Sequence, residues 1–322
     1  MKYKIYVGIA AIIIILYLLP AVSYAQFRVV GYVAPGAGSL PAVSEDAMKK
    51  LTHLNIAFVN PDSMGNLLLP ALFDSIIQQA KIHNVKVLMS IGGGSHNPYY
   101  ARLLNNDNRK NFIEKLASLA TDHQLDGIDV DLEGEAIDKN YDAFITGLSE
   151  RLKPAGKLLT SALATWNAQL ISTAALKKFD FINIMCYDQT GPWRPNEPGP
   201  HSTLLKAEEE LQYWTVTRGF PKKKVNLGVP FYGYCFGTRY GESMSYGEIV
   251  TTFPDAELQD MIVPANGGII YYNGQPTIQS KTNLALKNAG GVMIWQILQD
   301  ADGTKSLLST IDNIVKKVHP KN

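Results

Sequence analysis

The chain has 322 residues, of which 46% are apolar and 18% are charged, a composition typical of globular proteins and not of disordered or fibrous ones. Its 30 lysines and arginines nearly balance its 29 aspartates and glutamates, so the net charge is +1. A protein that binds nucleic acid needs a basic excess to neutralise phosphates, so we expect neither a nucleic acid nor an acidic polymer as partner.

The first 25 residues have the pattern of a secretory signal. Lys2 and Lys4 precede an uninterrupted apolar run, Ile5–Leu19, which is followed by Pro20 and the cleavage-site sequence Ser23–Ala25. This run is shorter than the roughly 20 residues that a membrane-spanning helix needs. We therefore predict cleavage after Ala25 and no stable membrane insertion afterwards, with a retained anchor as the alternative. Both interpretations predict export, to a secreted or periplasmic location.

Residues 26–322 alternate between strand-like and helical segments, with no linker between them, and are predicted to form one domain. The predicted strands are Phe27–Ala34, Leu54–Val59, Val85–Ile91, Gly127–Leu132, Leu158–Ala164, Phe179–Tyr187, Val225–Tyr232 and Gly291–Ile297. Apolar residues recur at helical spacing between them, as at Leu72, Ile76, Ile77 and Ala80. Eight strands alternating with helices predict an α/β fold, a closed (β/α)8 TIM barrel with its functional groups at the C-terminal ends of the strands.

The predicted strands are evenly spaced except between the seventh and the eighth. Residues 236–279 contain additional strand- and turn-like sequence there, and we predict a short insertion with room for a hairpin. The first strand is not followed by G-x-G-x-x-G, and the chain contains no G-x-x-x-x-G-K-[ST]. These two motifs bind nucleotide phosphates, so we predict no cofactor.

The two cysteines, Cys186 and Cys235, could pair in an oxidising compartment. Both lie in apolar, strand-like runs, which favours two buried thiols. Neither belongs to a Cys-x-x-Cys sequence and the six histidines are scattered, so we predict no metal site.

The fourth predicted strand carries three acidic residues, Asp129, Asp131 and Glu133, which alternate with apolar ones. In a barrel strand the apolar side chains pack on helices and the three carboxylates point inward. Three like charges in one confined space cannot all be ionised cheaply, so at least one pKa should be raised, as a general acid requires. The segment also resembles the start of a calcium-binding loop, but Asn140 stands where such a loop has glutamate, and the segment is predicted as a strand.

The octet Asp126–Glu133 resembles the D-G-x-D-x-D-x-E signature of glycoside hydrolase family 18, the chitinase family. Four further segments resemble motifs of that family in barrel order: Ser90–Gly93 (S-x-G-G), Met185–Asp188 (M-x-Y-D) with Gly191–Trp193 after it, Gly228–Gly233, and Gly290–Trp295 with its tryptophan. The resemblance extends from about Phe27 to the C-terminus and implies a TIM-barrel glycosidase.

The resemblance also implies a role for each acid. Glu133 would protonate the glycosidic oxygen and later activate water. Asp131 would orient the acetamido group of the substrate, which acts as the nucleophile in this family, and Asp129 would share a proton with Asp131. Tyr187 would donate a hydrogen bond to the acetamide.

Further residues would bind the sugar. By the same resemblance these are Tyr32, Phe58, Gly93, Met185, Asp188, Trp193 and Trp295. Met185 and Asp188 would shape the sugar subsite and Trp295 would form its floor. Some have simpler interpretations: Tyr32 and Phe58 could be core aromatics, and Trp193 could anchor a loop.

The favoured function is that of a secreted, monomeric chitinase that retains anomeric configuration while hydrolysing β-1,4 bonds between N-acetylglucosamine units of a polysaccharide or oligosaccharide. The short insertion predicts an open cleft and endo-type cleavage. An endo-β-N-acetylglucosaminidase acting on N-glycans is one alternative, since it would use the same pair of acids. A sugar-binding chitinase-like lectin is another, although such proteins typically lose the acid that Glu133 provides here.

Overall fold

The computed structural model describes residues 26–34, 43–95 and 97–318. The predicted signal segment, residues 1–25, lies outside the described residues. Among the helices that are described, we find none with both the length and the apolar character of a membrane span.

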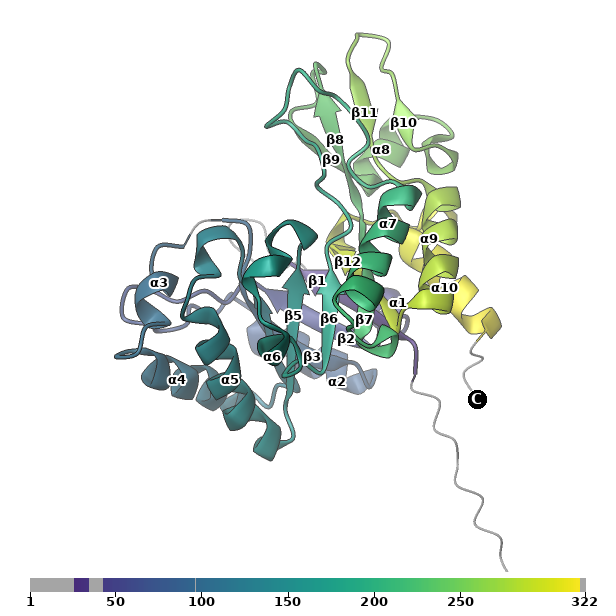
Figure 1. The fold of residues 1–322 in the computed structure, drawn as a ribbon. Coiled ribbons are helices and arrows are strands. Elements are labelled where there is room, and N and C mark those ends of the chain that lie inside the picture. Colours follow the sequence, from purple (N-terminus) through teal and green to yellow (C-terminus); the bar gives the residue numbers. More distant parts are fainter. Residues whose placement is uncertain (1–25, 35–42, 96, 319–322) are drawn as a thin grey trace, which may run out of the picture.

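Eight parallel strands close into a barrel (Figure 1). They are β1 (Arg28–Val33), β2 (His53–Ala57), β3 (Lys86–Gly92), β4 (Gly127–Asp131), β5 (Leu158–Leu163), β6 (Phe181–Ile184), β7 (Val225–Pro230) and β12 (Gly291–Trp295). Each strand pairs with its neighbour in this order, and β1 closes the barrel against β12, with Gly31 aligned to Ile294. The predicted TIM barrel is therefore confirmed.

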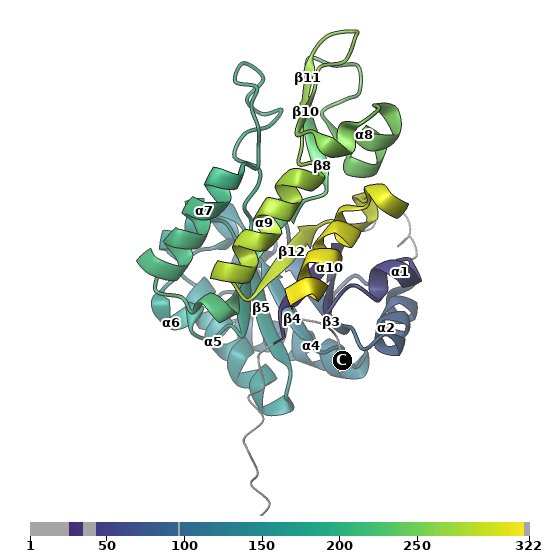
Figure 2. The ribbon, with the colours of Figure 1, turned by 90° about the vertical axis from the view of Figure 1, so that its right-hand side faces the viewer.

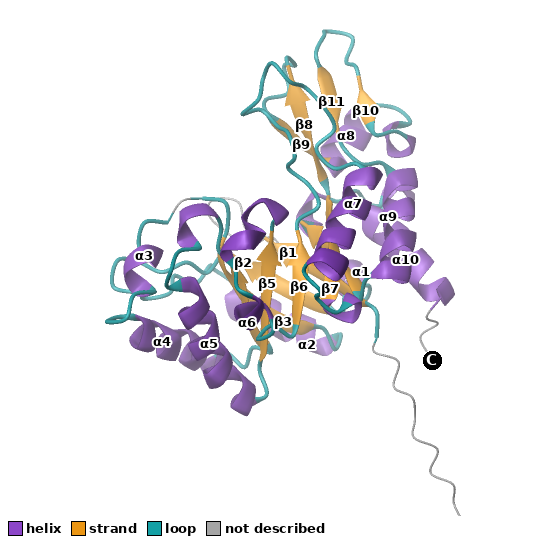
Figure 3. Ribbon diagram, in the orientation of Figure 1, coloured by secondary structure: helices purple, strands orange, loops and turns teal. Residues whose placement is uncertain are grey.

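Helices cover the outside of the barrel (Figure 3). They are α1 (Glu45–Met48), α2 (Phe73–Ile82), α3 (Tyr100–Leu103), α4 (Arg109–Asp122), α5 (Tyr141–Leu152), α6 (Thr173–Leu176), α7 (Leu204–Gln212), α9 (Gln275–Asn288) and α10 (Leu307–Val318). Their apolar faces meet the outward side chains of the strands, as Phe112 and Leu116 of α4 do. This layer contains most of the hydrophobic core.

The start of α2 differs from the predicted apolar stripe. Leu72 precedes the helix with a φ of 65°, in the left-handed region, and is 58% exposed. That conformation turns its side chain away from the face on which Ile76, Ile77 and Ala80 are buried.

A second, smaller core fills the inside of the barrel. It contains Val30, Tyr32, Ala57, Ala162, Phe181, Tyr187, Tyr232 and Met293. Cys186 and Cys235 are both buried and both free, as favoured from their apolar surroundings in the sequence.

The insertion between β7 and β12 contains more secondary structure than the hairpin expected from its length. It is a four-stranded antiparallel sheet in the order β10-β11-β8-β9, made of β8 (Tyr232–Phe236), β9 (Ser243–Ser245), β10 (Met261–Ile262) and β11 (Ile269–Tyr271), with the helix α8 (Tyr246–Thr252). Figure 2 shows this unit above α9 and α10. Strands of two or three residues, such as β10, carry too little periodicity to be recognised.

Candidate active site

Asp129, Asp131 and Glu133 lie at increasing height along β4 and just beyond it. Asp129 and Asp131 are buried, whereas Glu133, two residues after the strand, is half-buried. The alternation of the strand directs their side chains inward, while Ile128 and Val130 belong to the outer core.

Asp129 is held by three hydroxyl groups from three other strands. Tyr32 Oη and Ser90 Oγ donate to its Oδ2 over 2.6 and 2.8 Å, and Thr160 Oγ1 donates to its Oδ1 over 2.5 Å. Burial raises the pKa of Asp129, and these hydrogen bonds oppose the rise. Asp129 is thus a fixed group below Asp131, and proton sharing between the two stays a prediction.

One carboxyl oxygen of Asp131 lacks a hydrogen-bond partner among the described residues. This atom, Oδ1, is buried. Burial raises the pKa of Asp131 well above its usual value, and the charges of Glu133 and Asp129 raise it further. A buried polar atom without a partner costs about 1–3 kcal/mol, so this oxygen is suited to a ligand that brings a donor.

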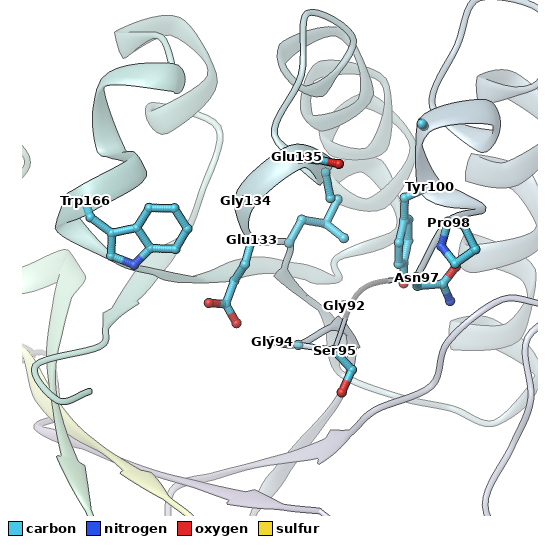
Figure 4. A pocket seen from close by; sticks show the side chains of 14 residues that line it. Gly92, Gly94, Ser95, Asn97, Pro98, Tyr100, Glu133, Gly134, Glu135 and Trp166 are labelled. Atoms are coloured by element: carbon cyan, nitrogen blue, oxygen red, sulfur yellow. The ribbon is translucent and has the colours of Figure 1, made fainter. Parts of the chain in front are cut away.

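Glu133 titrates close to neutral pH. Burial, followed by the charge of Asp188, raises the pKa of Glu133 to about 7. Its carboxylate points into the hollow between Trp166 and the turn at Gly94 and Ser95 (Figure 4). A carboxyl group with this pKa can donate a proton in one step and accept one in the next.

Two hollows meet at Glu133 and Trp166, and together they form a groove across the C-terminal ends of the strands. The first has a volume of about 490 Å³ and is lined by residues of 92–101 and 132–136 (Figure 4). The second has a volume of about 600 Å³ and is lined by segments that follow β5 and β6 and by Lys206 and Glu210 of α7.

Most of the sugar-binding residues expected from the sequence, and the expected catalytic residue Tyr187, line this groove. Gly93 lines the first hollow, and Met185, Tyr187, Asp188 and Trp193 line the second. Trp193 is 57% exposed and lies over Gly191, where a side-chain carbon would overlap the indole. It also meets the ring of Tyr234, 5.3 Å away, at the edge of the insertion.

Three aromatic residues form the base of the barrel mouth. Trp295 stacks on Phe58 with ring centroids 5.5 Å apart, and the ring of Tyr32 lies 5.6 Å from that of Trp295. Gly93, with a φ of 90°, allows this packing, because a Cβ atom there would overlap the Phe58 ring. The structure therefore brings Tyr32, Phe58 and Trp295 together beside the acids of β4.

Asp188 has an unusual backbone conformation, and its side chain contacts two residues that were not identified from the sequence. Its φ is 61°, in the left-handed region. The Tyr232 hydroxyl donates to its Oδ1, and Nδ1 of the buried His201 lies 3.4 Å from the same oxygen. Burial lowers the pKa of His201, which favours its neutral form.

Trp166 is the other important residue that sequence reasoning missed. It is 62% exposed, yet it stands where the two hollows meet. Thr165 beside it donates to Glu210 and accepts a hydrogen bond from Trp214 Nε1 over 3.1 Å. Burial raises the pKa of Glu210 to about 7. The signal was present, because Trp166 lies two residues after the predicted fifth strand, at the end where barrel sites lie.

Comparisons with known proteins agree with this fold. The solved structure of ChiB, a family 18 chitinase from the chitin utilization locus of Flavobacterium johnsoniae, is 38% identical, with a TM-score of 0.81 over 91% of this chain and 95% of that one. A chitinase from Bacteroides thetaiotaomicron is 26% identical, with a TM-score of 0.79 over 92% and 99%.

Among curated proteins, a class V chitinase of Arabidopsis thaliana is 28% identical over 65% of this chain, and the chain spans 63% of that protein's length. The family model for glycosyl hydrolases family 18 matches residues 28–300. The chain therefore belongs to glycosyl hydrolase family 18.

Proposed function

We propose that this protein is an exported chitinase that hydrolyses β-1,4 bonds between N-acetylglucosamine units with retention of configuration. One observation carries the proposal: Glu133, with a pKa of about 7, projects into the centre of a groove directly above the buried Asp131. A proton donor and a second carboxyl group with a free oxygen are the groups that a substrate-assisted glycosidase needs.

In the first step, protonated Glu133 gives its proton to the glycosidic oxygen. The acetamide carbonyl oxygen of the substrate attacks the anomeric carbon, the bond to the leaving sugar breaks, and a cyclic oxazolinium intermediate forms. Oδ1 of Asp131 accepts the acetamide N–H, and once its proton has passed to Asp129 the Asp131 carboxylate stabilises the positive charge. Tyr187 Oη donates a hydrogen bond to the carbonyl oxygen. It loses little by doing so, because its present partner, Met293 Sδ at 3.8 Å, is a weak acceptor.

In the second step, ionised Glu133 takes a proton from water as that water attacks the anomeric carbon. The ring of the intermediate opens and the acetamide is restored. Two inversions at one carbon give net retention, so the β-anomer is the first product.

The groove is suited to a neutral polymer of amino sugars. Trp295 and Phe58 form an apolar floor, and Trp166 and Trp193 offer exposed faces on which sugar rings can stack. Both tryptophans are more than half exposed, which supports an open groove that binds a chain in its middle.

The test compares wild type with Glu133→Gln on three ligands: colloidal chitin, soluble chitin oligomers and a defucosylated N-glycan. We expect wild type to release reducing ends from chitin and its oligomers, and early product to be the β-anomer by NMR. Cleavage of the N-glycan alone would assign the endo-β-N-acetylglucosaminidase activity instead. Binding of chitin oligomers without turnover in wild type would identify a lectin, and early α-anomer would exclude the substrate-assisted mechanism.

A further inference from the structure

Trp166 stands on a short turn that does little by itself to fix an exposed indole. This turn is the 3-10 segment Thr165–Leu170, between β5 and α6, and we call it the Trp166 turn. Its inner face is buried at Asn167 and Ala168, whereas the indole is 62% exposed. Because few protein atoms surround the ring, its direction over the groove (Figure 4) depends on how firmly the backbone of the turn is held.

The beginning of the Trp166 turn is tied to α7 and to the π turn that follows it, Tyr213–Thr217. The Thr165 hydroxyl donates to Glu210 of α7 and accepts a hydrogen bond from Trp214 Nε1 of the π turn over 3.1 Å. Trp214 is fully buried, so its N–H would be costly to leave unpaired. Thr165 is therefore held from two directions.

The end of the Trp166 turn is tied to a third residue of the same helical segment. Arg218 Nη1 donates to the backbone oxygen of Ala168, and Arg218 Nη2 donates to that of Ile171 over 2.7 Å. The guanidinium carbon lies 5.7 Å from the centroid of the Trp214 ring. A guanidinium fork that binds two carbonyl groups at once fixes the direction of the backbone that carries them. Trp166 thus stands between two anchored ends.

The π turn brings these anchors onto one face of the helix. At about 100° per residue, Arg218 of a regular α-helix would lie about 80° around the axis from Glu210. The backbone N–H of Arg218 instead donates to the backbone oxygen of Tyr213, five residues earlier, over 2.8 Å. The residue that a π turn adds sets Arg218 back by about 100°, to within about 20° of Glu210. This turn therefore directs Arg218 toward the Trp166 turn.

We propose that Arg218 is a positioning residue for sugar binding. Together with Trp214 and Glu210 it holds the Trp166 turn, so that the indole is already in place when a chitin chain enters the groove. Preorganisation of this kind strengthens binding, because the complex does not have to order a loop. Arg218 is not among the described residues that line the two hollows, so it acts on the sugar through Trp166.

The inference rests on the proposed function in that it takes Trp166 as a sugar-binding surface, but it does not depend on catalysis. The test variant is Arg218→Met, which keeps an unbranched stem and removes every donor, and Arg218→Lys is the conservative variant that retains a donor. The matched control is Arg109→Met. Arg109 is also half-buried and also donates to a backbone oxygen, that of Leu104 over 3.2 Å, but it lies outside the lining of both hollows.

The position of the indole is measured first, without a ligand. Protein labelled with fluorotryptophan gives one fluorine NMR resonance for each of the four tryptophans, assigned by single Trp→Phe substitutions. We expect one narrow Trp166 resonance in wild type, in Arg218→Lys and in the control, and a broadened or shifted one in Arg218→Met. The resonances of Trp193 and Trp295 should stay in place, which shows that the barrel is intact. A Trp166 resonance that does not change in Arg218→Met would overturn the inference.

The dissociation constant for a chitin hexasaccharide is then measured by calorimetry, with Glu133→Gln in every protein to prevent turnover. Arg218→Met should weaken binding by about five- to tenfold, whereas Arg218→Lys and the control should change it by less than about twofold. In a chain that also carries Trp166→Ala, Arg218→Met should have no further effect, because the indole on which it acts is absent. Equal losses with and without Trp166 would overturn the inference.

Trp214→Phe tests the other end of the turn and replaces Arg218→Met if that variant does not fold. It keeps a buried aromatic ring and removes the N–H that holds Thr165, so binding should weaken by a similar factor, again only when Trp166 is present. Failure of the proposed function is recognised separately. A wild type that binds the hexasaccharide but does not hydrolyse it would refute the chitinase activity and leave the positioning role to be decided by the same two measurements.

Discussion

At the scale of single residues, Glu133 combines partial burial with access to the groove. Burial raises its pKa to about 7, so a large fraction of the molecules carry the proton that the leaving oxygen needs at neutral pH. The deeper acids, Asp131 and Asp129, are buried among protein atoms. One strand thus gives three carboxyl groups different environments, through their depth and through the groups beside them.

Glu133→Gln should abolish turnover and preserve binding. The amide keeps the shape of the side chain and removes the proton donor, so kcat on soluble oligomers should fall by about 10²–10⁴-fold or more. The dissociation constant for a chitin oligomer, measured by calorimetry, should change by only about threefold, because stacking on the tryptophans is retained. A variant that keeps kcat within about tenfold of wild type would remove Glu133 from the mechanism.

Asp188→Asn should shift the pH profile. The charge of Asp188 is the second cause, after burial, of the raised pKa of Glu133. Without that charge the pKa of Glu133 falls, so the basic limb of kcat/KM against pH should move to lower pH. Glu135→Gln, which removes a carboxylate elsewhere in the groove, is the control and should leave the limb in place. A limb that stays in place or moves upward in Asp188→Asn would contradict this electrostatic account.

At the scale of elements, the barrel strands could be predicted from the sequence, whereas the roles of several loops and the content of the insertion could not. The eight strands, of four to seven residues, lie in mostly apolar runs, and the carboxylates of β4 follow from strict alternation, so local pattern was sufficient. Trp166 was identifiable from its place after β5. His201 was not, because its role comes from a loop that returns to Asp188. The insertion was underestimated, although Ser245 and Glu248 form a capping box that could have indicated α8.

Lys281 is a further example of a role that only tertiary structure shows. It lies in α9 among polar residues typical of a surface helix, yet it is fully buried. Its Nζ donates to the backbone oxygen and Oγ of Ser202, over 2.8 and 2.7 Å, and to Asn273 Oδ1 over 2.7 Å. Ser202 Oγ donates in turn to the backbone oxygen of Cys186, next to Tyr187. Lys281 thus joins α9, the end of the insertion and the segment after β6.

Lys281→Met should change how stability depends on pH. Burial lowers the pKa of Lys281 from 10.5 to about 7, so between these values the unfolded chain binds more protons than the folded one. The contribution of Lys281 to the free energy of unfolding of the wild type therefore rises with pH, by about 1.4 kcal/mol per pH unit between pH 7 and 10.5. Below pH 7 this contribution is constant. Near pH 9 the variant should be less stable by about 2–3 kcal/mol, because the buried amine, neutral at that pH, donates two hydrogen bonds that methionine cannot make.

That difference should shrink as the pH falls toward 7, and urea unfolding of both proteins at pH 7 and 9 measures it. The same substitution at Lys287, exposed on the same helix, is the control and should change stability little at either pH. A deficit in Lys281→Met that is equal at both pH values would show that the buried amine does not titrate in this range.

At the scale of the whole molecule, the mode of attack on a polymer depends on what stands beside the groove. The four-stranded insertion gives one side more structure than a hairpin would, and Tyr234 of β8 touches Trp193. Both hollows are nevertheless lined by residues from Gly92 to Glu210, outside the insertion, and Trp166 and Trp193 remain more than half exposed. These exposed faces favour an open groove that a polymer chain can enter sideways.

A groove of this kind should cleave chains internally and release them after each event, because two exposed tryptophans hold a polymer less firmly than an enclosed track would. The viscosity of a soluble chitin derivative should then fall early, before many reducing ends appear. Trp166→Ala should lower kcat/KM on long oligomers by about ten- to a hundredfold, from the loss of about 1–3 kcal/mol of ring stacking, and change the shortest substrates less. A slow fall in viscosity, with disaccharide as the main product from the first minutes, would instead demonstrate processive cleavage. The insertion would then enclose the groove, a role that the residues lining the two hollows do not give it.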